Sequence, residues 1–146
     1  MKNILFSLIL ATFLVTSTKA EDNVVAVIDG YQTLFLLQHG AAFIDNRPQH
    51  KFARGHIHGA VNLPYYTPDH STNIMSKDNL AVALGGKDVA VFYCSGALRA
   101  YQAIRQAQEW GFTLPMYWYR NGWAEWQLLT LGPASESVAA DSDQQE

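Results

Sequence analysis

A buried strand that leads into an amphipathic helix constrains the fold of this chain more than any other feature. Residues Asp88–Tyr93 form a continuous apolar, β-rich run, which is typical of a strand buried on both faces of a parallel sheet. A helix is predicted over Ala97–Trp110, where apolar residues recur at spacings of three and four, and Gly111 ends it. A buried strand followed by a crossover helix predicts an α/β domain.

The rest of the chain continues this alternation of strands and helices. Strands are expected over Val24–Ile28, Ala41–Asp45, Ala60–Leu63 and Leu114–Tyr119, and helices over Tyr31–Gln38, Asn79–Leu84 and Trp123–Leu131. The polar stretch Thr67–Asn73 is expected to be a loop. These patterns predict one domain, over about residues 23–132, with a central, mostly parallel sheet flanked by helices.

The N-terminal segment has the pattern of an export signal. Lys2 precedes the apolar run Ile4–Val15, and the small residues Thr18 and Ala20 fit a cleavage site, so residues 1–20 are predicted to be a signal peptide. The protein is then expected to be exported, to the periplasm if the source is a Gram-negative bacterium. A retained membrane anchor is the weaker alternative, because the run is short for a membrane span.

The charge of the remaining chain is mildly acidic. Loss of the signal peptide removes two lysines and no acid, which changes the formal net charge from −3 to −5. The charge therefore gives no reason to expect nucleic acid or an anionic membrane as a partner. The small, polar and acidic tail of residues 133–146 is expected to be disordered.

The chain has a single cysteine, Cys94. Exported domains of this size often use disulfides, but one thiol cannot form an intramolecular bridge. Cys94 is therefore an inert buried side chain, a dimerising thiol or a reactive one.

The position of Cys94 favours the reactive alternative. It lies where the predicted buried strand ends and the next helix begins, and ligands of open α/β sheets bind outside the carboxyl ends of the strands. Backbone N–H groups and the helix dipole at such a position both favour an anion. Gly96 permits close approach of a ligand, and Arg99 adds a positive charge with donors suited to an oxyanion. We therefore predict a nucleophilic thiolate in an anion-binding loop.

Three stretches of the sequence resemble the rhodanese family. Cys94–Arg99 is similar to the six-residue active-site loop of the family. Ile44–Arg47, followed by Gly55–Pro64, resembles the upstream signature, and Asn121–Trp126 resembles the closing Gly-Gly-Trp-x-x-Trp element. In this order, the three stretches cover nearly the whole chain from Val24 to Pro133.

The resemblance implies a single rhodanese-like domain with sulfurtransferase activity. Cys94 would be the catalytic nucleophile and would carry sulfur as a persulfide. The substrate-binding residues would be Ser95, Gly96, Ala97, Leu98, Arg99 and Arg47. Sulfur would pass from a small anionic donor such as thiosulfate to a thiophilic acceptor, either cyanide or a thiol, including a thiol on a protein. No cofactor is implied.

The loop departs from the family pattern in ways that leave the donor and the acceptor open. Gly96 stands two places after the cysteine instead of the usual three, and Ala100 follows the loop where serine is common. Some exported relatives linked to quinoprotein dehydrogenases have a second cysteine at the position of Arg99. Phosphatases that resemble rhodaneses place five residues between cysteine and arginine, whereas this loop has four, so the tighter loop suits sulfur better than phosphate.

Two other functions remain possible for a domain of this kind. It could be a non-catalytic docking or regulatory module, although the intact Cys94 argues against this alternative. It could also be a redox-sensing thiol protein, since an exposed thiolate is readily oxidised. The chain has no resolving cysteine, so that route would need an external thiol.

Several other polar residues invite functional interpretations. Asp45 and Arg47 are expected near Cys94, and the preferred interpretation is an ion pair that fixes the loop, although Arg47 could also attract an anionic donor. His56 and His58 supply only two possible zinc ligands, so no metal site is expected. His56 is instead expected to bond to the backbone or to Asp45.

Two tryptophans and an arginine near the C-terminus are the last candidate functional residues. Trp123 and Trp126 are three apart on a predicted helix, which indicates core packing. Arg120 follows the last strand and lies either at the mouth of the pocket or simply on the surface.

Overall fold

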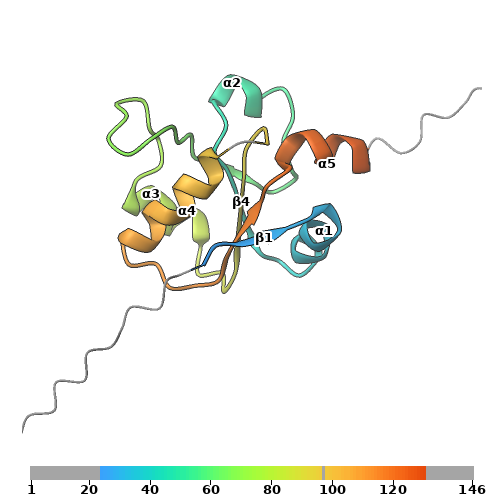
Figure 1. Cartoon of the computed structure of the whole chain (residues 1–146), viewed down its shortest axis with the longest axis horizontal. Coiled ribbons are helices and arrows are strands. Elements are labelled where there is room, and N and C mark those ends of the chain that lie inside the picture. The colour runs from blue at the N-terminus through green and yellow to red at the C-terminus, as the bar shows by residue number, and fades with distance from the viewer. Residues whose placement is uncertain (1–23, 97, 131–146) are drawn as a thin grey trace, which may run out of the picture.

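A five-stranded parallel sheet lies between two layers of helices (Figure 1). The structure, a computed structural model, describes residues 24–96 and 98–130. The elements in chain order are β1 (Ala26–Ile28), α1 (Gly30–Gln38), β2 (Ala42–Asp45), α2 (Gln49–Phe52), β3 (Val61–Asn62), α3 (Lys77–Leu84), β4 (Ala90–Tyr93), α4 (Arg99–Glu109), β5 (Met116–Tyr119) and α5 (Gly122–Thr130). The predicted α/β architecture is confirmed.

The strand order is β1-β5-β4-β2-β3, and every neighbouring pair is parallel. β4 is the central strand. Its last residue, Tyr93, lies beside Asp45 of β2 and Tyr119 of β5. The carboxyl ends of the three middle strands therefore meet at one edge of the sheet, where a ligand is expected in this fold.

The core consists of one hydrophobic cluster on each face of the sheet. Ala90 and Phe92 of β4 pack with buried residues of α3 and α4, and Cys94 belongs to the same cluster. Val91 and Tyr93 point to the opposite face, where they pack with Trp126 of α5. Because successive side chains of a strand alternate between faces, a strand covered on both faces is apolar throughout, as the sequence of β4 is.

Local sequence explains where several helices begin and end. Asp29 and Gln32 form a capping box at the start of α1, with reciprocal hydrogen bonds of 2.8 and 3.0 Å. The Ser76 hydroxyl caps α3, and Gly85 ends that helix in the left-handed conformation that glycine adopts without strain.

Each predicted element begins one or two residues from its predicted start. The short helix α2 was not predicted; it follows Pro48, whose ring blocks further strand pairing. The strand expected over Ala60–Leu63 is reduced to the two residues of β3. The last strand starts at Met116 instead of Leu114, and α4 starts at Arg99 instead of Ala97.

The predicted terminal segments, residues 1–20 and 133–146, lie outside the described residues. Among the residues that the structure describes, no helix is long and apolar enough to cross a membrane.

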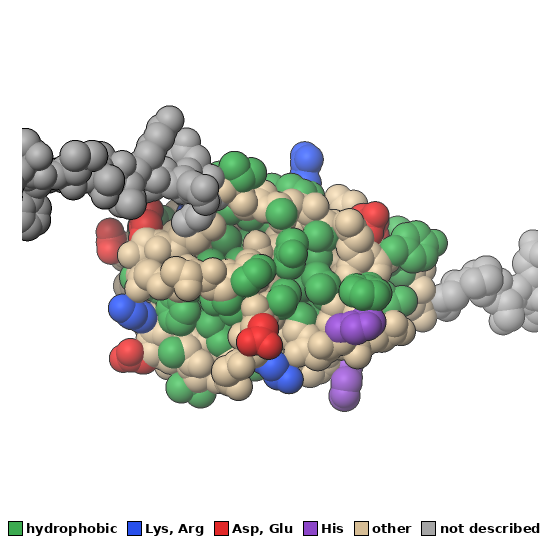
Figure 2. All heavy atoms as spheres, turned by 90° about the horizontal axis from the view of Figure 1, so that it is seen from below, with side chains coloured by type: hydrophobic (Ala, Val, Ile, Leu, Met, Phe, Trp, Pro, Cys, Tyr) green, Lys and Arg blue, Asp and Glu red, His purple; other side chains and the backbone are tan. Residues whose placement is uncertain are grey.

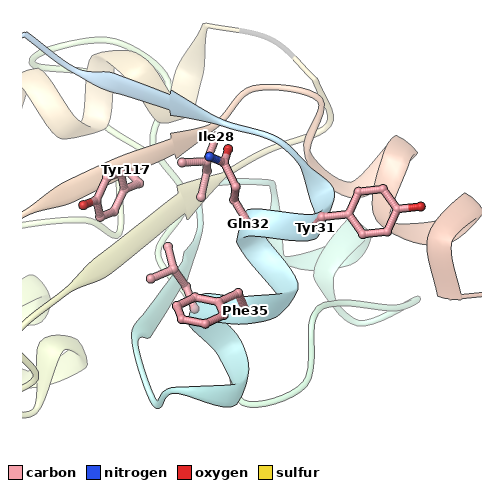
Figure 3. A pocket seen from close by; sticks show the side chains of 6 residues that line it. Ile28, Tyr31, Gln32, Phe35 and Tyr117 are labelled. Carbon is pink, nitrogen blue, oxygen red and sulfur yellow. The ribbon is translucent and has the colours of Figure 1, made fainter.

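One face of the molecule carries clustered hydrophobic side chains (Figure 2). Tyr31 and Phe35 of α1 are exposed, and with Ile28, Gln32, Leu36 and Tyr117 they line an open, mostly apolar pocket of about 430 Å³. Figure 3 shows that the ring of Tyr31 points away from the other labelled side chains of this pocket.

The Tyr93 hydroxyl is buried and accepts a hydrogen bond of 3.1 Å from the Ile57 N–H. Burial, followed by the charge of Asp45, raises the pKa of Tyr93 far above its ordinary value of 10.0. In the unfolded chain, this tyrosine loses its proton near pH 10, whereas the folded protein retains it. The unfolded state then binds fewer protons, so stability is lost as pH rises through and beyond 10.

We therefore expect the free energy of unfolding to fall with pH above 10, and to fall less steeply in Tyr93→Phe. At neutral pH the variant should be less stable by about 1–3 kcal/mol, because the Ile57 N–H loses its partner. Urea unfolding at a series of pH values measures both effects. Equal slopes in the two proteins would contradict the assignment to Tyr93.

Candidate active site

Cys94 directly follows the central strand β4 at the carboxyl edge of the sheet. Its exposed fraction is 0%, and it packs against the first turns of α4. The Cys94 carbonyl accepts a hydrogen bond of 2.9 Å from the Trp123 N–H in the first turn of α5. The strand end that carries the thiol is thus tied to a second element far away in sequence.

Two glycines shape the chain around Cys94. Gly96 has φ +115°, and Gly122 has φ +56°, conformations that favour glycine. Gly122 lies directly against the Cys94 carbonyl: a Cβ at this position would overlap the carbonyl oxygen and would lie 3.2 Å from the Gly96 nitrogen. The backbone of the cysteine loop therefore requires glycine at position 122.

We expect Gly122→Ala to displace the Cys94 loop and to reduce any activity that depends on Cys94, because the added methyl group meets backbone atoms that cannot rotate away. The loss of stability should exceed the roughly 1–3 kcal/mol of a left-handed backbone alone. Gly86→Ala is the matched control, since Gly86 has φ +74° and no atom within 4 Å of its added Cβ. Activity assays and urea unfolding compare the two variants; an equal effect of both would contradict the proposed contact.

Asp45 and Arg47 form a buried ion pair beside the cysteine loop. The Arg47 Nε donates to both Asp45 carboxylate oxygens at 3.0 Å, and Nη2 lies 2.6 Å from Oδ2. The same Nη2 donates to the Gly55 carbonyl at 2.7 Å, and the Asn62 amide donates to the carbonyls of both partners. The side chains of Asp45 and Arg47 are 0% and 2% exposed. The preferred interpretation, a pair that fixes the loop, is confirmed.

The Arg47 guanidinium also contacts aromatic rings from two other elements. Its carbon lies 4.7 Å from the ring centroid of Trp123 and 5.7 Å from that of Tyr93. Such cation–π contacts hold the guanidinium between the end of β4 and the start of α5. Trp126 is buried, and Trp123 is half-buried and packs against the same core cluster, so the prediction of core packing is confirmed. Trp123 also lines the pocket beside the cysteine loop.

An open pocket of about 370 Å³ adjoins the cysteine loop. It is lined by Arg47, Lys51, Arg54, Ser95, Trp123, Ala124 and Gln127. Figure 1 shows α2 and α5 at the same end of the molecule, where the carboxyl ends of the strands lie. The sequence reasoning missed Lys51 and Arg54, because it missed α2. The available signal was the basic composition of residues 49–54, which include no acid.

The other predicted loop residues are placed differently. Ser95 lines the pocket and Gly96 is exposed, whereas Leu98 points outward with 61% exposure. Arg99 is half-buried, with its guanidinium carbon 5.8 Å from the Tyr66 ring centroid, and it is not among the pocket residues. Ala97 lies outside the described residues. The cations that line the pocket are therefore Arg47, Lys51 and Arg54.

The later start of α4 changes the electrostatic argument for the thiol. Arg99, the first residue of the helix, is five positions after Cys94. The effect of a helix dipole is confined to the first turn, so the loop has a larger part in any anion binding here than the helix has.

His56 and Arg120 have structural contacts. The His56 ring bonds to the Phe52 carbonyl at 3.0 Å and stacks on the Phe52 ring, so of the two expected partners the backbone is the one observed. Arg120 is exposed beside Trp118, outside the pocket. In the part of the chain that the structure describes, no three His, Cys, Asp or Glu side chains are grouped as metal ligands.

The burial of Cys94 bears on the redox-sensing alternative. Susceptibility to oxidation follows thiolate character and exposure, and a side chain with no exposed surface does not meet the second condition. The structure therefore does not favour a redox-sensing role.

Comparison with known proteins identifies the family and the fold. Residues 19–129 match the family model described as Rhodanese-like domain. No curated protein matches the sequence. Human single-domain sulfurtransferase TSTD1 is 23% identical, with a TM-score of 0.53 over 72% of this chain and 97% of that one.

Two further solved structures share the fold. The rhodanese-like domain of the Anabaena sp. Alr3790 protein is 20% identical, with a TM-score of 0.56 over 84% of this chain and 91% of that one. Reduced Bacillus anthracis CoADR-RHD is 20% identical, with a TM-score of 0.52 over 70% of this chain. This chain spans only 16% of the length of the Bacillus protein.

Proposed function

The chain belongs to the rhodanese-like domain family, and from this premise we propose that it is a sulfurtransferase that carries sulfane sulfur as a Cys94 persulfide. The observation that carries the proposal is the position of Cys94 at the carboxyl end of the central strand, beside a pocket lined by cations. Cations in the neighbouring pocket support an anionic intermediate on this thiol.

The first half-reaction loads the cysteine. The Cys94 thiolate attacks the outer, sulfane sulfur of thiosulfate, the S–S bond of the donor breaks, and sulfite leaves with the bonding electron pair. The product is a Cys94 persulfide anion. Cys94 is buried, so the donor reaches it from the side of the pocket that Ser95 lines.

The second half-reaction regenerates the thiolate. The acceptor, cyanide in an assay, attacks the outer sulfur with its lone pair, and the persulfide S–S bond breaks. Thiocyanate leaves, and the bonding electrons return to Cys94. We expect the backbone N–H groups of the loop to stabilise the negative sulfur in both half-reactions, and the reaction needs no cofactor.

Proposals about the setting of the protein rest on the sequence. The N-terminal pattern of a basic residue, an apolar run and a cleavage site supports export, with a periplasmic location in a Gram-negative source. The acidic net charge supports small-molecule or protein partners over nucleic acid.

Steady-state kinetics test the two-step mechanism. Initial rates with both thiosulfate and cyanide varied should give parallel double-reciprocal lines, because the first product leaves before the second substrate binds. Intersecting lines would indicate a ternary complex and would contradict a free persulfide enzyme.

A further inference from the structure

The pocket beside Cys94 is strongly asymmetric in charge. Three of its lining residues are cations, Arg47, Lys51 and Arg54, and no lining residue is an acid. The whole chain carries a formal net charge of −3, so the charge of this cluster is opposite in sign to that of the protein. A local positive pocket on an acidic protein attracts anions to one place.

The three cations do not contribute equally. The charge of Arg47 is offset by Asp45 in the buried ion pair. Lys51 and Arg54, by contrast, take part in no ion pair with any residue that the structure describes. Lys51 is half-buried and Arg54 exposed, and the Arg54 Nε donates to the His50 carbonyl at 3.2 Å, which holds that side chain against α2. The positive charge available to a ligand is therefore that of Lys51 and Arg54.

The size of the pocket exceeds what cyanide or thiosulfate requires. Pockets for small organic ligands start at about 300 Å³, and this one has about 370 Å³. Trp123 supplies an apolar wall, and Gln127 supplies an amide. These features suit an organic molecule with a short apolar part and a charged end.

The positive charge of Lys51 and Arg54 can act in the second half-reaction. A thiol acceptor reacts as its thiolate, so it brings a negative charge into the pocket. Nearby cations attract this charge, and they favour an acceptor whose other end is also anionic.

We propose that Lys51 and Arg54 form an acceptor-specificity site for small organic thiols that carry a carboxylate or sulfonate group. The inference rests on the proposed sulfurtransferase function. The persulfide anion first takes up a proton from water. The acceptor thiolate then attacks the protonated outer sulfur of the Cys94 persulfide, the persulfide S–S bond breaks, and the Cys94 thiolate leaves with the electron pair. The acceptor departs as an organic persulfide that retains the proton.

Three thiols of similar size and different charge test the site. The protein is loaded with thiosulfate, loading is checked by intact mass, the donor is removed, and loss of the persulfide is followed with 2-mercaptoethanesulfonate, 2-mercaptoethanol or 2-mercaptoethylamine. Each acceptor is compared between wild type and the Lys51→Glu/Arg54→Glu double variant, so differences in intrinsic thiol reactivity cancel. Lys87→Glu, at the opposite end of β4, is the control for charge reversal away from the site.

We expect the double variant to lower the rate with the sulfonate by about tenfold, to change the rate with the neutral thiol by less than about twofold, and to raise it with the amine. Added salt should reduce the difference for the sulfonate. Lys87→Glu should change none of the three rates appreciably. Lys51→Gln, which removes charge without reversing it, should give a smaller effect of the same sign.

The outcomes separate the two proposals. If the wild-type protein is loaded with sulfur but the double variant changes the rates with all three acceptors equally, the specificity site is overturned and the sulfurtransferase function stands. A wild-type protein that takes up no sulfur would overturn the function, and with it this inference. Circular dichroism of the double variant checks that its fold is intact.

Discussion

Cys94→Ser is expected to reduce sulfur transfer from thiosulfate to cyanide by about a thousandfold or more, the scale seen when a covalent nucleophile is removed. A serine hydroxyl is a much weaker nucleophile than a thiolate, and it cannot form a persulfide. Cyanide-dependent production of thiocyanate measures the effect.

The surroundings of Cys94 indicate how this substitution should affect the fold. Cys94 is fully buried among α4 and sheet residues, and serine is nearly the same size, so the fold should be kept, while the buried hydroxyl should cost about 1–3 kcal/mol of stability. A cooperative thermal unfolding transition above the assay temperature is the control. Substantial activity in a folded Cys94→Ser protein would mean that another group carries the sulfur.

Arg47→Met is expected to destabilise the protein by about 3–5 kcal/mol, because it leaves the buried Asp45 carboxylate without its partner. The variant also removes the hydrogen bond to the Gly55 carbonyl and the contact with the Trp123 ring. Urea unfolding measures the loss as a lower midpoint of the transition.

The double variant Asp45→Asn/Arg47→Met separates the unpaired charge from the other lost contacts. It removes the buried negative charge, so it should be more stable than Arg47→Met alone by a clear margin. The amide oxygen that replaces the carboxylate can still accept the hydrogen bond from the backbone N–H of residue 47, which Asp45 accepts at 2.9 Å. If the double variant were instead the less stable of the two, the unpaired carboxylate would not be the main cause.

Much of the fold follows from local sequence. The apolar, β-rich run of β4 is typical of a strand covered on both faces, and glycine and proline positions ended the elements near the observed places. Parallel strands place Cys94 and Asp45 at one edge of the sheet, so this part of the site was predictable from the parallel direction of the strands.

The parts that were missed depend on contacts distant in sequence. α2 is a four-residue helix with no apolar periodicity, so no pattern distinguishes it from a loop. Lys51 and Arg54 enter the pocket only because α2 packs near α5. Similarly, Gly122 looks like an ordinary turn residue in the sequence, and its contact with the Cys94 carbonyl exists only in the folded chain.

The most direct test of the account is the intact mass of the protein before and after thiosulfate, followed by cyanide. The account predicts a gain of one sulfur atom per chain, which cyanide removes and which Cys94→Ser does not show. No gain in a protein whose Cys94 is verified as reduced would contradict the central claim that this thiol carries sulfane sulfur.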